Sequence, residues 1–205
     1  QADLIGIGLY GILAIVLMLI AGFLCEKILL PSFSNTKEII EDQNLGTAFV
    51  EAGMHIANGL IVLAIVQGEG PLVSGIAFWL LAQVVLIVAG RLYEMITPHS
   101  IHDELERDNA AVGLAFAGLL VGMGNIISIA VAGDYSGWQV GLQVFAMDVG
   151  FGFVALYGIH KLTDVILAPG ISLGSEQVKQ QPNVGAGLIE AIGYLGGSTL
   201  IVWIF

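Results

Sequence analysis

Residues 44–53 read NLGTAFVEAG, residues 109–118 read NAAVGLAFAG and residues 183–191 read NVGAGLIEA. Each stretch begins with an asparagine and continues as a run of Gly, Ala and larger apolar residues. The asparagines stand 109 − 44 = 65 and 183 − 109 = 74 residues apart. An apolar segment that ends in an acid and a proline precedes each stretch: Glu26 with Pro31, Glu94 with Pro98, and Asp164 with Pro169. Self-similarity over such distances indicates three copies of one structural unit.

The composition is that of a membrane protein. Hydrophobic residues make up 57% of the 205 residues, charged residues only 11%, and the mean hydropathy is +0.90. Apolar stretches of about 20 residues are long enough to cross the hydrocarbon core as helices. Six occur, at residues 4–25, 45–66, 72–90, 110–132, 138–159 and 184–205. We therefore predict an all-α polytopic membrane protein with six transmembrane helices.

The six helices pair naturally into three units within a single transmembrane domain, residues 1–205. The units cover residues 4–66, 72–132 and 138–205, and each runs outside to inside and back. They are therefore parallel two-helix repeats, whose symmetry axis lies along the membrane normal. Many secondary transporters instead have inverted repeats, related by an axis in the membrane plane.

The basic residues predict the orientation. All six lie in or beside the three long connections: Lys27, Lys37, Arg91, Arg107, Lys161 and Lys179. The positive-inside rule places these connections in the cytoplasm and both termini outside. An outside amino end that begins at Gln1 fits removal of a signal peptide and fits a trimmed start equally. The net charge of −11 argues against nucleic acid as a partner.

Ionisable residues inside the predicted helices are the first candidates for function. Glu51, His55 and Asn58 share one helical face, and Glu190 follows its asparagine by seven residues, as Glu51 does. Asp148 lies near the middle of residues 138–159. A carboxylate in hydrocarbon is costly unless it is paired, neutralised or hydrated. One interpretation is a proton or cation path lined by these residues; the other is hydrogen bonding that holds helices together.

The three asparagines also allow two interpretations. Asn44, Asn109 and Asn183 each begin an apolar segment, where asparagine is a good N-cap. Alternatively, they form a polar ring at the cytoplasmic mouth of a path.

No sequence pattern points to catalysis, so we predict that the chain is not an enzyme and needs no cofactor. His99, His102, Asp103 and Glu106 have spacings that a metal site uses, but an acidic helix start gives the same pattern. We therefore predict no metal site. The single cysteine, Cys25, rules out a disulfide within the chain.

With its repeated asparagine and Gly/Ala-rich segment, the chain resembles the bacterial inner-membrane family called domain of unknown function 350. The members of that family look like arrays of this two-helix unit. The resemblance covers most of residues 26–205, although this chain has three units where even numbers are usual. It implies a bacterial cytoplasmic membrane and partnership with other membrane or stress-response proteins. It supplies no activity and no functional residues.

Two functions are consistent with these features. The first is an ion- or proton-conducting channel or transporter-like component that uses the intramembrane carboxylates. The second is a non-catalytic accessory or scaffold subunit of a larger membrane complex. In both cases we expect the partners to be the lipid bilayer and either further copies of the chain or other membrane subunits.

Overall fold

The computed structural model describes residues 2–29, 34, 36–68, 70–132 and 135–204, and nearly all of them are helical. Six long helices follow one another, with shorter helical segments between some of them. The long helices are α1 (Ala2–Leu24), α2 (Leu45–Gln67), α3 (Leu72–Ile96), α5 (Ala110–Ala132), α6 (Trp138–Leu167) and α8 (Val184–Ile204). The short segments are two π-helical pieces, η1 (Cys25–Leu29) and η2 (Lys37–Glu41), and two α-helices, α4 (Ile101–Glu106) and α7 (Leu173–Gln177).

Six of the described helical stretches are long and apolar enough to cross a membrane, the first of them running from α1 into η1. The prediction of an all-α chain with six membrane-length helices is therefore confirmed. Gln1 and Phe205 lie outside the described residues.

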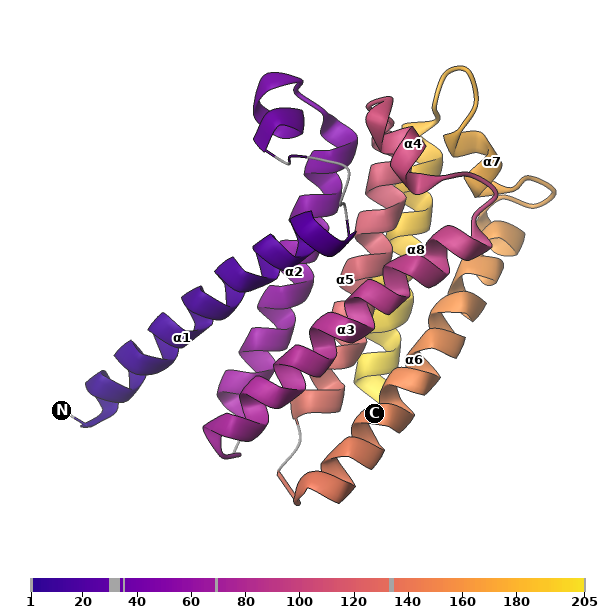
Figure 1. The fold of residues 1–205 in the computed structure, drawn as a ribbon. Helices are drawn as coiled ribbons and strands as arrows, with labels where there is room; N and C mark the ends of the chain where they lie inside the picture. The colour runs from indigo at the N-terminus through magenta and orange to yellow at the C-terminus, as the bar shows by residue number, and fades with distance from the viewer. Residues whose placement is uncertain (1, 30–33, 35, 69, 133–134, 205) are drawn as a thin grey trace.

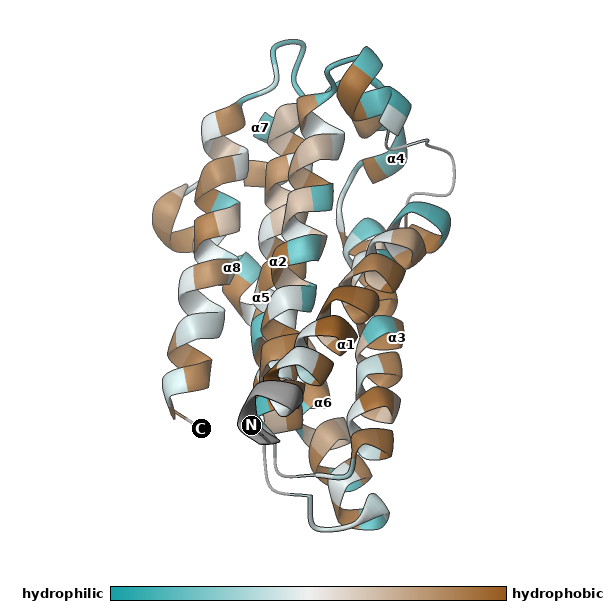
Figure 2. Cartoon of the chain, turned by 90° about the vertical axis from the view of Figure 1, so that its left-hand side faces the viewer, coloured by the Kyte–Doolittle hydropathy of each residue, from teal (hydrophilic) through white to brown (hydrophobic). Residues whose placement is uncertain are grey.

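The chain runs back and forth between two ends of the bundle (Figure 1). The short segments η2, α4 and α7 gather at one end, which we call the long-connection end. The start of α1 and the end of α8 lie at the opposite, short-connection end. Hydrophilic residues are concentrated at the long-connection end around α4 and α7, while the long helices are mostly hydrophobic (Figure 2).

Two helices extend further than their apolar segments predict. Helix α3 continues past residue 90 to Ile96, and α6 continues past residue 159 to Leu167. In each case one residue separates the end of the helix from a proline, Pro98 or Pro169. Steric hindrance disfavours helical backbone in the residue that precedes a proline. The charged residues in these last turns do not interrupt the helix, so the proline and not the polarity sets its end.

Helices α2, α5 and α8 stand side by side, with α5 between the other two (Figure 1). α5 is the most buried long helix, whereas α1 is mostly exposed. A Cβ atom added to Gly53 of α2 would lie 2.7 Å from the Cα of Ala117 in α5. Gly118 of α5 approaches Ala191 of α8 in the same way. Small residues thus let these three helices pack backbone to backbone.

Candidate functional site

Glu190 is the centre of a buried polar cluster at the long-connection half of the bundle. It is the seventh residue of α8, about 10 Å along the helix axis from its start, and only 2% of its surface is exposed. Four side chains surround its carboxyl group: Tyr93 from α3, His160 from α6, Gln177 from α7 and Tyr194 from α8. We call these five residues the Glu190 cluster.

Short hydrogen bonds hold the carboxyl group. The Tyr93 hydroxyl donates to Oε1 at 2.9 Å, and the Gln177 amide donates to Oε2 at 2.5 Å. His160 Nδ1 lies 2.9 Å from Oε1, and the Tyr194 hydroxyl lies 3.2 Å from the same Nδ1. Both carboxyl oxygens are therefore occupied, as a buried acid requires.

Aromatic rings enclose the cluster. The rings of His160 and Tyr194 stack, with centroids 6.3 Å apart, and Tyr93 stacks on Phe116 of α5 at 5.6 Å. Phe116 follows Asn109 by seven residues, so it occupies in α5 the position that Glu190 has in α8. The cluster is thus shielded on the α5 side by an apolar ring.

Glu51 and His55 form a second acid–histidine pair on α2. Glu51 Oε1 lies 3.2 Å from His55 Nε2, and 20% and 48% of the two side chains are exposed. Gly22 of α1 packs against this imidazole, since a Cβ added there would lie 3.1 Å from His55 Cε1. The pair lines a groove of about 770 Å³ between α1, η2 and α2. Unlike Glu190, this pair is accessible from the surface of the bundle.

The remaining candidates lie elsewhere. Asn58 accepts a hydrogen bond of 2.7 Å from Gln83 of α3 and donates to the Met54 carbonyl, so it ties α2 to α3. Asp148 lines a small cavity of about 40 Å³ between α5, α6 and α8, together with Ile126 and Ile201. The structure therefore brings Glu51 and His55 together, but it places Asp148 and Glu190 in two other locations.

The asparagines act as N-caps. The side-chain oxygen of Asn44 accepts from the Thr47 amide at 2.8 Å. That of Asn109 accepts from two amides in the first turn of α5, and that of Asn183 accepts from Ala186 at 3.3 Å. The capping interpretation is therefore correct for all three, and a role at the mouth of a path stays a prediction.

Sequence reasoning identified Glu190 but missed its partners Tyr93, Gln177, Tyr194 and His160. His160 is the only histidine among them. It precedes Asp164 by four residues, as Gly22 precedes Glu26 and Gly90 precedes Glu94. A Cβ atom added to Gly22 would lie 3.1 Å from His55 of α2, and one added to Gly90 would lie 3.1 Å from Phe116 of α5. The three units therefore align at this position, but only the structure shows that His160 lies opposite Glu190.

His99, which lies between α3 and α4, is half-buried, and neither ring nitrogen has a hydrogen-bond partner within the described part of the chain. Burial lowers the pKa of His99, and the nearby carboxylates Glu104 and Glu190 oppose this effect. Burial thus favours the neutral form of the His99 imidazole.

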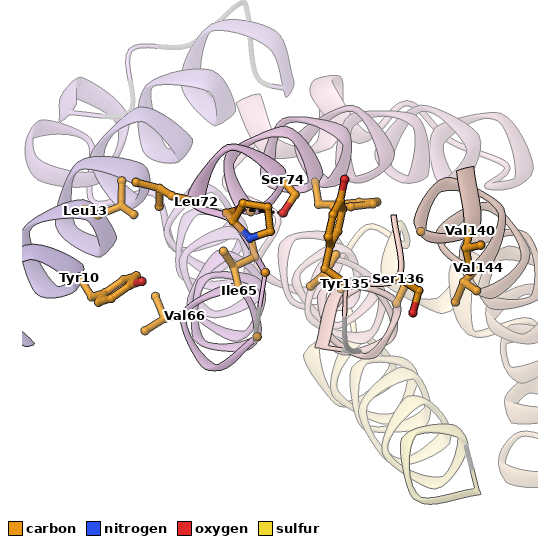
Figure 3. Close-up of a pocket in the computed structure, with 18 residues that line it drawn as sticks. Tyr10, Leu13, Ile65, Val66, Leu72, Ser74, Tyr135, Ser136, Val140 and Val144 are labelled. Atoms are coloured by element: carbon orange, nitrogen blue, oxygen red, sulfur yellow. Dashed lines mark hydrogen bonds between the residues drawn. The ribbon is translucent and has the colours of Figure 1, made fainter. Parts of the chain in front are cut away.

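A separate pocket lies at the short-connection end and contains none of the predicted acids. It has a volume of about 140 Å³, and Tyr10, Ile65, Ser74 and Tyr135 are among the residues that line it (Figure 3). The Ser74 hydroxyl donates to the Pro71 carbonyl at 2.6 Å. With the Ser74 hydroxyl already bonded and the walls mostly apolar, this pocket offers less chemistry than the Glu190 cluster.

One family model, described as Domain of Unknown Function (DUF350), matches residues 1–66 and 69–205. No curated protein and no solved structure matches the chain.

Proposed function

Because the chain belongs to the family described as Domain of Unknown Function (DUF350), whose description assigns no activity, we propose from the site itself that it is a proton-handling membrane protein. The Glu190–His160 pair is its proton-binding site, and the Glu51–His55 pair is a second one. The observation that carries this proposal is that both intramembrane glutamates are paired with a histidine, although the histidines come from different helices.

The chemistry of the pair suits proton exchange. In water, a glutamate and a histidine bind a proton with reference pKa values of about 4.3 and 6.5. Removal from water disfavours the ion pair relative to the two neutral groups. The neutral and charged forms of a buried pair therefore come closer in free energy, and a proton can pass between Glu190 and His160 along one hydrogen bond.

The pair is also connected to the long-connection end. Gln177 belongs to α7 and donates to Glu190 Oε2. A proton placed on that oxygen would oppose the amide donor and weaken the bond. Protonation of Glu190 would therefore loosen α7 from the bundle, which gives the site a route to the aqueous phase.

The orientation follows from the positive-inside rule. The long-connection end is cytoplasmic, both termini are outside, and both pairs lie in the cytoplasmic half of the bacterial inner membrane. The three helix pairs are parallel repeats. The recurrence of one backbone pattern supports this. The backbone N–H groups of Asn44, Asn109 and Asn183 donate to the backbone carbonyls of Glu38, Glu104 and Glu176, in that order.

Proton flux into liposomes tests the proposal. Wild-type protein should acidify the vesicle interior under an imposed gradient, and Glu190→Gln should abolish this flux. Asp148→Asn is the matched control, because it removes an intramembrane acid that has no histidine partner among the described residues, and it should retain the flux. Equal flux in wild type and Glu190→Gln, or none in wild type, would contradict the proposal.

A non-catalytic subunit of a larger membrane assembly is the second candidate. It is favoured by apolar helix faces that nothing in the described chain covers, including Leu63 of α2 (54% exposed) and Trp203 of α8 (84% exposed). The mass of the protein in mild detergent tests it, because a stable lone monomer would exclude it.

A further inference from the structure

The contact between α2 and α5 recurs between α5 and α8 at the same positions. Gly46 meets Gly113, and Ala111 meets Gly187. In each pair, the first residue follows its asparagine by two positions (46 − 44, 111 − 109) and the second by four (113 − 109, 187 − 183). Each of these helices therefore presents one face to the helix before it and a different face to the helix after it.

The next turns repeat the pattern. Gly53 meets Ala117, and Gly118 meets Ala191. In each pair, the glycine follows its asparagine by nine residues and the alanine follows its own by eight. Ala57 and Gly124 meet in the same way, at thirteen and fifteen residues after Asn44 and Asn109. Counting positions from each asparagine, we call the side with positions two, nine and thirteen the forward face, and the side with positions four, eight and fifteen the rear face. Two forward faces, on α2 and α5, are docked on the rear faces of α5 and α8.

Side-chain hydrogen bonds extend the same junction. The Asn44 amide donates to the Leu105 carbonyl at 2.7 Å, and the Asn109 amide donates to the Gln177 carbonyl at 2.9 Å. Each asparagine thus caps its own helix and also binds the connection that precedes the next one. Leu105 and Gln177 directly follow Glu104 and Glu176, and the equivalent residue of the first connection is Ile39, which follows Glu38.

Both ends of this row are open. On α8, the forward face comprises Gly185, Ile192 and Gly196, and all three are exposed. Asn183 is exposed too, whereas Asn44 and Asn109 are buried. On α2, the rear face comprises Ala48, Ala52 and Gly59, which are exposed or half-buried. A Cβ atom added to Gly59 or Gly196 would meet nothing within 4 Å.

The open rear face of α2 also carries the second acid–histidine pair. His55 follows Asn44 by eleven residues, the position of Tyr194 in α8, which contacts Gly122 on the forward face of α5. Gly22 of α1 packs against one side of the His55 imidazole, yet nearly half of the side chain is exposed in a helix that is apolar enough to cross a membrane. A polar side chain in contact with lipid is costly, so a covering surface is favoured here.

From the continuity of this interface we infer that a second copy of the chain docks the forward face of its α8 on the rear face of α2, and so continues the row of parallel helices from one molecule into the next. In this junction Gly185 faces Ala48, Gly196 faces Gly59 and covers His55, and the Asn183 amide donates to the Ile39 carbonyl. The contact joins two different surfaces, so it builds a ring or a linear array and not a two-fold dimer.

Ile192 distinguishes this junction from the internal ones. It stands nine residues after Asn183, where Gly53 and Gly118 stand in the other units, and it is 55% exposed. Its side chain prevents backbone contact at that level. The two copies therefore stand further apart than α2 and α5 do, and their association is weaker than the internal packing and reversible.

Cysteine cross-linking between two populations of full-length protein tests the inference. In a Cys25→Ser background, one population carries Gly196→Cys and the other Gly59→Cys, and neither substitution meets a neighbouring atom. A short bis-maleimide should give a dimer in the mixture and little in either population alone. Val154→Cys is the control for Gly196→Cys, because it lies at a similar depth on α6 and is 72% exposed.

The chain that carries both Gly196→Cys and Gly59→Cys should give a ladder of dimers, trimers and larger species. Ile192→Gly should raise the cross-linking yield, because it restores the close approach. The inference would be overturned by three results: no cross-link in the mixture, equal cross-linking in the single populations, or equal yield with Val154→Cys. Cross-linking of Gly196→Cys only to a different protein would overturn it as well.

Discussion

The carboxyl group of Glu190 is held by side chains from four helical segments, so its stability depends on the packing of all four. A buried acid with every oxygen occupied is stable only while its partners stay in place. Glu51 occupies the equivalent position in α2, where it pairs with His55 and is partly exposed. The glutamate therefore contributes more to the stability of the fold in α8 than in α2.

Replacing Glu190 with leucine should test this difference in stability. The substitution leaves Tyr93, His160 and Gln177 without their acceptor, and each buried polar group without a partner costs about 1–3 kcal/mol. We expect Glu190→Leu to lower the free energy of unfolding by about 3 kcal/mol or more. Glu51→Leu is the matched control and should cost about 1 kcal/mol or less. Unfolding in mixed micelles with increasing SDS measures both, and equal losses would contradict the account.

His99 predicts how stability depends on pH. Burial lowers its pKa in the folded state, so the unfolded chain takes up the proton first as the pH falls. The contribution of His99 is therefore fully present above the unfolded pKa of about 6.5 and is lost below it. We expect the thermal midpoint in detergent to fall between pH 7.5 and pH 5, and to fall less in His99→Gln. An identical fall in the variant would show that other groups are responsible.

At the scale of the helix, an asparagine can cap its own helix and also bind the next connection. The sequence alone does not show which asparagines do both. Asn109 caps α5 and also binds the Gln177 carbonyl, whereas Asn183 caps α8 and is exposed. An N-cap contributes about 1 kcal/mol, and a further buried hydrogen bond contributes about as much. We expect Asn109→Ala to cost about 2 kcal/mol and Asn183→Ala about 1 kcal/mol in the isolated chain. Equal costs would show that the bond to Gln177 contributes nothing.

The helix row depends on the absence of side chains at particular glycines. A Cβ atom added to Gly118 would overlap the backbone of Ala191, while one added to Gly150 of α6 would meet nothing within 4 Å. Gly118→Ala should therefore cost about 1–3 kcal/mol through overpacking. Gly150→Ala should be neutral or slightly stabilising, because alanine favours helix. The account would be wrong on this point if the two variants unfolded alike.

The sequence predicts the elements better than it predicts their contacts. Length and hydropathy are properties of single segments, so the six membrane-length helices could be identified from composition alone. Hydropathy underestimates the lengths of α3 and α6, because both helices continue through charged turns almost to Pro98 and Pro169. His160 was missed because its role depends on what lies opposite it, in α8, and helix periodicity within α6 carries no such information. Asn58 was grouped with Glu51 for the same reason, although it bonds to Gln83 of α3.

At the scale of the whole molecule, the bundle is a row of three closely packed helices, crossed on one side by α3 and α6 (Figure 1). The central helix α5 carries no ionisable residue. The Glu51–His55 pair lies on α2, and the Glu190–His160 pair joins α8 to α6. The two pairs are therefore separated within one chain. In an array of copies, the open face of α8 would lie against α2 of the next molecule, and this arrangement would bring the two pairs closer together.

The central claim is that the Glu190–His160 pair takes up and releases a proton within the bundle. Infrared difference spectroscopy of the protein in lipid, recorded between neutral and acidic pH, tests it most directly. We expect a band from a protonated carboxyl group that is absent in Glu190→Gln and shifted in His160→Gln. A spectrum unchanged by Glu190→Gln would contradict the claim and leave the cluster as a structural link between helices.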